Sequence, residues 1–247
     1  MGDKNLNELL RWSIENSASV PDGTTDAAPR STLNPEALAA LMGGPSDADL
    51  MRDSMAAIVS PDPAITLEAK LTAFDNLEQL IESLDNANLL SKLGLWTPLL
   101  DCLAHAEAEI RLMAAWCVGT AVQNNEPSQE RLVALGGVER LVQMAVGKRV
   151  APAPAAASTP APVADGGEDG EDEGEGEGET KNVRRKALYA LSSAVRNYQP
   201  AMDVCAAELR RQGEGEHVGD DDKIIDATDM DAVDLVINGL KQKVPSA

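Results

Sequence analysis

A repeat of about 42 residues constrains the fold of this chain more than any other feature. The segment from Leu93 to Leu103 aligns with Leu135 to Ala145 at a shift of 42 residues. A second pair, Arg111 to Asn124 and Arg184 to Asn197, aligns at a shift of 73, and the excess of 31 matches a low-complexity insertion between the two copies. A period of about 40–47 residues with helical patterning is typical of armadillo and HEAT solenoids. The sequence therefore predicts an all-α, armadillo-like, right-handed solenoid.

The insertion is recognised by its composition. Residues Ala151 to Pro162 contain four prolines, which favour extended backbone. Between Asp165 and Glu179, nine of fifteen residues are acidic and none is Lys or Arg, so the net charge of −20 would be −11 without this run. Such a run repels itself and has no apolar surface to bury, so we expect disorder. The predicted organisation is a flexible N-terminal segment at 1–32, armadillo-like repeats at 33–148, the insertion at 149–180 and the last helices at 181–247.

Helical periodicity places the elements inside and outside the repeats. Leu112, Ala115, Val118 and Val122 recur at helical spacing and predict one apolar stripe. Glycines at 94, 136 and 137 stand between predicted helices, where a positive φ is useful. Further helices are predicted at 6–16, 34–42, 47–58 and 230–240.

No group of residues in the sequence forms a catalytic constellation. The two histidines, His105 and His217, are predicted to be solvated loop residues, because neither has neighbouring residues that would tune it. Cys102 and Cys117 lie on neighbouring predicted helices and are too far apart for a CxxC motif, so we interpret them as small buried hydrophobes. We therefore predict no catalytic residues, no metal site and no cofactor.

The charge balance limits the partners. With 41 acidic against 21 basic residues, the chain would be repelled by nucleic acid and by anionic membranes. No run of 18 apolar residues and no secretory signal is present, and three cysteines fit a reducing compartment. We expect a soluble cytoplasmic protein.

Equivalent positions of the repeats predict a binding surface. In an armadillo stack, the third helix of each repeat lines a concave groove. On these helices Phe74, Trp116 and Tyr189 occupy one repeat position, so half of the six aromatic residues are equivalent. Polar residues at i+4 and i+8 share their helix face. An aromatic and polar groove suits a protein partner, although the same aromatics would also serve to fill the core between repeats. The predicted groove residues are Phe74, Glu78, Trp116, Thr120, Asn124, Tyr189, Ser193, Arg196 and Asn197.

The same segments carry a family resemblance. SLDNANLL at 83–90, AAWCVGTAVQNN at 114–125 and ALYALSSAVRNYQPAMD at 187–203 resemble the fungal cytosolic Fes-type armadillo proteins, as does the opening LNELLRWSIENS at 6–17. These proteins are nucleotide exchange factors of heat-shock protein 70 chaperones. The resemblance spans nearly the whole chain except the insertion.

The resemblance implies a function that spacing alone does not give. Members of the family grip the ATPase domain of the chaperone with the armadillo groove and promote ADP release, after which ATP binding releases the client. By motif, the contact surface would include Asn86, Ala87 and Asn88. The N-terminal segment would help to displace clients through Leu6, Leu9, Leu10, Trp12 and Ile14, although these residues would equally suit a helix that caps the first repeat.

An adaptor that binds an extended peptide in its groove is the alternative. Importin-type grooves bind basic peptides through a ladder of Trp and Asn, and an acidic chain would suit that ligand. Here Thr120 follows Trp116 by four residues and Ser193 follows Tyr189 by four, so the Asn ladder is missing.

Overall fold

The computed structural model describes residues 44–152, 178–219 and 224–244. The chain is divided at Ser46 and Asp47, and all the described helices lie in the second unit, Asp47–Ala247. The described residues contain ten α-helices and no strand, which confirms the predicted all-α class. None of the described helices is long and apolar enough to cross a membrane. The predicted helices at 6–16 and 34–42, with Leu6, Leu9, Leu10, Trp12 and Ile14, fall outside the described residues.

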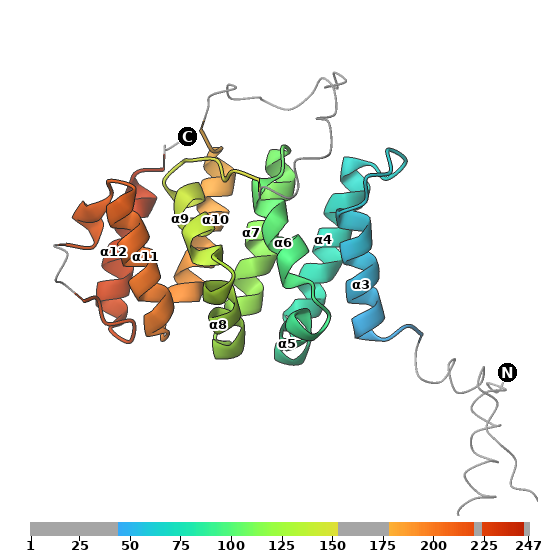
Figure 1. Ribbon diagram of the computed structural model, residues 1–247, viewed down its shortest axis with the longest axis horizontal. Coiled ribbons are helices and arrows are strands. Elements are labelled where there is room, and N and C mark those ends of the chain that lie inside the picture. Colours follow the sequence, from blue (N-terminus) through green and yellow to red (C-terminus); the bar gives the residue numbers. More distant parts are fainter. Residues whose placement is uncertain (1–43, 153–177, 220–223, 245–247) are drawn as a thin grey trace, which may run out of the picture. The chain divides into compact units, whose positions relative to one another are not determined.

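The helices of the second unit follow the repeat (Figure 1). Three helices of 15 residues each, α4, α7 and α10, are the third helices of successive repeats, and shorter helices connect them. The helix predicted at 47–58 is α3, and the last predicted amphipathic helix is α12. The bounds are α3 (Asp47–Ile58), α4 (Leu67–Ile81), α5 (Leu84–Lys92), α6 (Trp96–Asp101) with η1 (Cys102–Ala104), α7 (Ala108–Val122), α8 (Glu126–Ala134), α9 (Gly137–Ala145), α10 (Lys181–Val195), α11 (Gln199–Arg211), η2 (Gly215–His217) and α12 (Met230–Gln242).

Helix α7 lies at the centre of the stack. It packs against α4 on one side and against α10 on the other. Buried residues therefore occur around most of its circumference rather than on one stripe, and Leu112 of the predicted stripe is only partly buried. A helix covered by neighbours on several sides has no polar face to show in its sequence, which explains why the one-stripe prediction was too narrow.

Two of the three glycines that were expected between helices adopt the left-handed conformation. Gly94 has φ 71° and Gly136 has φ 69°, one repeat apart. Gly137 begins α9, and its role differs, because an added Cβ would lie 2.1 Å from a methyl group of Leu132. Gly137 is thus explained by close packing rather than by positive φ.

The margins of the insertion belong to the folded repeat, which corrects the boundaries at 149 and 180. Lys148 and Gly178 form an isolated antiparallel bridge, so the chain leaves and re-enters the fold at one place. Thr180 caps α10 by accepting a hydrogen bond from the amide of Val183. The Glu179 side chain is fully buried and pairs with Arg111 of α7 at 2.7 Å. Composition assigned Glu179 to the disordered run because its partner lies 68 residues away in the sequence.

Candidate functional site

The three equivalent aromatic residues of α4, α7 and α10 do not play equivalent roles. Phe74 has no exposed surface and fills the core, so its assignment to the binding surface is wrong. Trp116 and Tyr189 remain half-buried. Helix α4, which carries the first repeat position, packs against both α3 and α7, and sequence periodicity does not tell which positions such neighbours bury.

Trp116 and Tyr189 stand beside a half-buried lysine. The ammonium of Lys186 lies 3.3 Å from the centroid of the Trp116 ring and 5.7 Å from that of Tyr189. Burial lowers the pKa of Lys186, and the charge of Glu78 acts in the opposite direction. The ring of Tyr189 rests on Gly119 of α7, where an added Cβ would come within 2.6 Å of it. Lys186 and Gly119 were missed from the sequence, although Lys186 precedes Tyr189 by three residues and shares its helix face.

One helical turn after the aromatic position, a polar contact joins α4 and α7. The hydroxyl of Thr120 donates to Oε1 of Glu78 at 2.7 Å, and the Glu78 side chain is largely buried. One turn later the prediction fails, because α7 and α10 end at 122 and 195. Asn124 and Asn197 follow these ends with φ 51° and φ 57°, a conformation that Asn tolerates better than most residues. Both asparagines are exposed, but in turns rather than on the helix face.

Arg196 and Ser193 serve internal contacts. The guanidinium of Arg196 donates to Asp234 of α12 and to the hydroxyl of Ser192 at 3.1 Å, so Arg196 joins α10 to the last helix. The backbone carbonyl of Ser193 accepts a hydrogen bond from Gln129 at 3.1 Å. The Gln129 amide also donates to the carbonyl of Arg196 at 3.0 Å, so this one side chain satisfies carbonyl groups at the C-terminal end of α10.

The segment 83–90 turns mostly inward. Asn86 is 8% exposed and donates to Asp47 of α3 at 2.8 Å and to the carbonyl of Leu80 at 3.0 Å. Ala87 is 1% exposed, and Asn88 is half-buried. Asn86 thus positions the start of α5. The exposed residues of this segment are Ser83, Leu84 and Asp85, and Leu84 is a large apolar side chain at 55% exposed.

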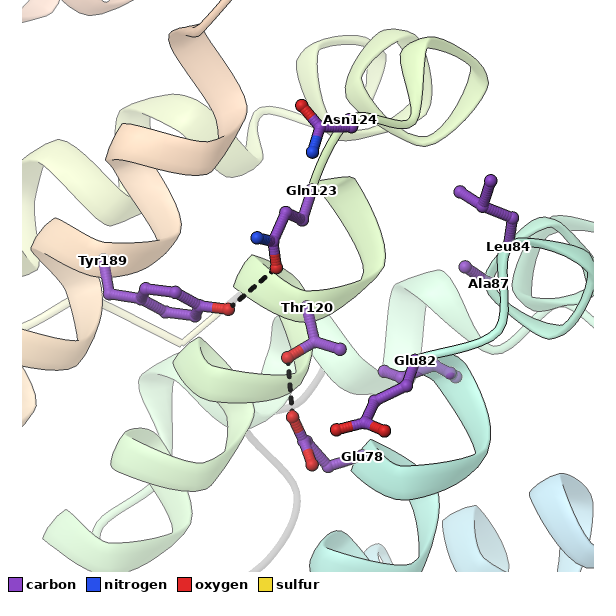
Figure 2. Close-up of a pocket in the computed structure, with 9 residues that line it drawn as sticks. Glu78, Glu82, Leu84, Ala87, Thr120, Gln123, Asn124 and Tyr189 are labelled. Atoms are coloured by element: carbon purple, nitrogen blue, oxygen red, sulfur yellow. Dashed lines mark hydrogen bonds between the residues drawn. The ribbon is translucent and has the colours of Figure 1, made fainter.

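These elements line a half-open pocket of about 410 Å³, which we call the groove pocket. Figure 2 shows that the ends of α4 and α7, the start of α5 and the Tyr189 ring of α10 contribute to it. The Tyr189 hydroxyl donates to Gln123 at 3.4 Å. Of the predicted groove residues, the pocket brings together four, with Ala87 added from the motif, while Trp116, Ser193, Arg196 and Asn197 lie outside its lining. The pocket is lined by Glu78, Ile81, Glu82, Leu84, Ala87, Thr120, Gln123, Asn124 and Tyr189.

The cysteines are placed as small hydrophobes. All three are buried, and burial raises the pKa of Cys102 and of Cys205 to about 12 and that of Cys117 well above its usual value. A nucleophilic or metal-binding cysteine needs the thiolate, which burial disfavours at each of these positions.

His217 is not the solvated loop residue that we expected. Its side chain is 13% exposed and packs against Gly239 of α12. Together with Glu214 and Glu216 it forms a group of potential metal-binding atoms within 4.8 Å of one another. The ammonium of Lys243 contacts both of these carboxylates, so the chain itself already supplies a cation to them.

Sequence comparison covers the whole chain. A family model described as Nucleotide exchange factor Fes1 matches residues 6–90. The Hsp70 nucleotide exchange factor FES1 of Gibberella zeae is 53% identical over 249 residues, which is 100% of both chains. The Hsp70 nucleotide exchange factor fes-1 of Neurospora crassa is 46% identical over 99% of this chain and 100% of its own length. The chain belongs to the Fes1 family. A further Fes1 relative, from Saccharomyces cerevisiae, is 38% identical over 78% of this chain and 57% of its own length.

Membership of the Fes1 family confirms the resemblance seen in the sequence. The family match at residues 6–90 includes α4 and the start of α5, and so it includes the part of the groove pocket formed by Glu78, Glu82 and Ala87. The pocket residues beyond residue 90 lie in α7, in the turn that follows it and in α10, which the full-length alignments cover.

Proposed function

We propose that this chain is a nucleotide exchange factor of Hsp70 that accelerates ADP release. The observation that carries the proposal is the full-length similarity to relatives that bear this name, at 53% and 46% identity. Its partner is the ATPase domain of a cytosolic Hsp70, and it acts as a cytoplasmic monomer. The chain breaks no bond in this reaction, because the chaperone supplies the nucleotide site and the factor supplies binding energy.

The mechanism is one of thermodynamic linkage. The factor binds more tightly to a chaperone conformation that holds ADP poorly, and so it shifts the population toward that conformation. ADP must then weaken the binding of the factor by the same ratio. A coupling of about 5- to 150-fold in ADP affinity would be typical of such systems. After ADP has left, ATP binding releases the client and the factor.

Stopped-flow release of a fluorescent ADP analogue from the chaperone tests this function. We expect the release rate to rise with the concentration of the factor and to saturate near stoichiometry. An unchanged release rate with excess folded protein would refute the proposal.

The groove helices α4, α7 and α10 and the segment 83–90 form the proposed contact surface, with Ala87 in the wall of the groove pocket. Ala87→Arg would place a long side chain into the pocket and is expected to abolish binding of the ATPase domain. Because Ala87 is buried, Leu84→Ala serves as a milder test at an exposed position, with an expected loss of about threefold in affinity. Ala69→Arg, on the exposed surface near the start of α4, is the control and should bind normally. Unchanged binding by both pocket variants would reject this placement.

The leading segment and the adaptor alternative are tested separately. Residues 1–32 are proposed to help displace clients through Leu6, Leu9, Leu10, Trp12 and Ile14, so their deletion should slow client release while ADP release stays unchanged. A generic adaptor would instead bind a basic peptide with an affinity that matches or exceeds that for the isolated ATPase domain.

A further inference from the structure

Two carboxylates in the groove pocket form no ion pair within the part of the chain that the structure describes. Glu78 is 7% exposed, and its carboxylate accepts a hydrogen bond from the hydroxyl of Thr120 at 2.7 Å. Glu82 is exposed at the end of α4, and Figure 2 shows both carboxylates turned toward the same space. Within the described residues, neither Glu78 nor Glu82 forms an ion pair. The nearby cation, Lys186, is held over the Trp116 ring instead.

This arrangement is unfavourable for the chain on its own. Removing a carboxylate from water costs free energy unless a cation or several hydrogen-bond donors replace the lost water. Glu78 receives one neutral hydroxyl, and the second negative charge of Glu82 stands at the same pocket. A positively charged group entering the pocket would relieve both penalties, because it would pair with a buried carboxylate whose desolvation has already occurred on folding.

The rest of the pocket is suited to a side chain rather than to a small ion. Its wall includes the apolar side chains of Ile81, Leu84 and Ala87. Lysine and arginine combine an apolar stem with a charged head, and they bury the stem on apolar surface. A cavity of about 410 Å³ accommodates either of them.

We infer that the groove pocket binds a basic side chain of the partner protein, with the stem on Leu84 and Ala87 and the charged head between Glu78 and Glu82. The partner is the one named under the proposed function, and in that respect the inference rests on it. The net charge of −20 would steer a basic surface of the partner toward this chain. Glu78 supplies the stronger contact, since it is the more deeply buried of the two carboxylates.

The first test measures the affinity for the ATPase domain at several salt concentrations. Glu78→Gln keeps the size of the side chain and its acceptor for Thr120 but removes the charge, and we expect about tenfold weaker binding. Glu82→Gln removes a more exposed charge and should weaken binding about threefold. Both variants should show a shallower dependence of affinity on salt than the wild-type chain. Glu130→Gln is the control, because it removes the same charge at an exposed position of α8 outside the pocket.

Stability separates a binding defect from misfolding. Since Glu78→Gln removes a largely buried charge that forms no ion pair, its thermal midpoint should equal or exceed that of the wild-type chain. Weaker binding by a variant that is at least as stable supports the inference. Affinity and salt dependence equal to those of Glu130→Gln would overturn it, while ADP release by the wild-type chain would still support the proposed function.

The second test does not require the chaperone. We would titrate the full chain with N-acetyl-arginine amide, N-acetyl-lysine amide and the uncharged N-acetyl-norleucine amide, and follow the amide resonances of Ala87, Thr120 and Gln123. The basic compounds should shift these resonances in the wild-type chain and not in Glu78→Gln, and the stronger of the two identifies the preferred head group. Equal shifts with all three compounds, or none with any, would overturn the inference even if the chaperone were not the partner.

Discussion

The buried ion pair between Arg111 and Glu179 provides the sharpest test of how the repeats are held together. Two nitrogens of Arg111 donate to Glu179, at 2.9 and 2.7 Å, and a third donates to the carbonyls of His105 and Ala106. The Arg111 side chain is 2% exposed and that of Glu179 is 0% exposed. The pair therefore ties the end of the insertion to the central helix α7.

Glu179→Gln should cost about 3 kcal/mol in the free energy of unfolding. Removing one partner of a buried ion pair typically costs about 3–5 kcal/mol, because an uncompensated charge stays buried. We take the lower end of this range because Arg111 keeps its bonds to the two carbonyls. For a folded unit of this size, the loss corresponds to a fall of about 6–12 °C in the melting temperature.

Urea unfolding followed by circular dichroism would measure this loss, with Glu130→Gln as the control for the change in charge. The double variant Arg111→Met/Glu179→Leu removes both charges and should recover most of the stability, since an apolar pair of similar volume often replaces a buried ion pair at little cost. A loss below about 1 kcal/mol for Glu179→Gln, or a double variant less stable than the single, would refute the reasoning.

Three further predictions concern packing, chain connectivity and pH. Gly119→Ala places a Cβ within 2.6 Å of the Tyr189 ring and 3.0 Å of the Ala190 backbone, so it should lower the free energy of unfolding, measured with denaturant, by about 1–3 kcal/mol. An unchanged unfolding midpoint would contradict the close packing of α7 against α10. Replacing residues 153–177 with Gly-Ser shortens the connection between the bridged residues Lys148 and Gly178 from 29 to 6 residues; lower loop-closure entropy should stabilise the chain by about 1.4 kcal/mol, whereas a marked loss would show that the replaced residues contribute to folding. Three carboxyl groups near α11 and α12 should make this end of the solenoid sensitive to acid. Burial alone would raise the pKa of Glu208, but hydrogen bonds from Arg211 and Gln212 lower it overall. Hydrogen bonds from Lys243 lower the pKa of Glu216, and hydrogen bonds from Thr228 lower the pKa of Asp226. Their stabilising contribution is complete above the ordinary values of 4.5 and 3.8 and is lost as the pH falls through the lowered values, so hydrogen exchange of α11 and α12 should accelerate before that of α4, and simultaneous acceleration would contradict this assignment.

Periodicity and turn residues determined the architecture of this protein at the level of sequence. A helix needs contacts between residues three and four apart, and a solenoid repeats the same contacts every 42 residues, so both signals are local or periodic in the chain. The positive φ of Gly94 and Gly136 one repeat apart has the same origin. The family was also readable from the sequence, because several long segments match in the same order.

Only the tertiary structure decided which of the repeated positions face outward. Phe74, Trp116 and Tyr189 are equivalent in sequence, yet the first is fully buried and the second and third are half-buried. Asn86 and Arg196 have the chemistry of contact residues but are held by Asp47 and Asp234. Glu179 looks like part of an acidic run, and its partner Arg111 is 68 residues away. Burial and pairing depend on which distant segments meet, and the repeat pattern specifies the positions of the helices without specifying what covers each of them.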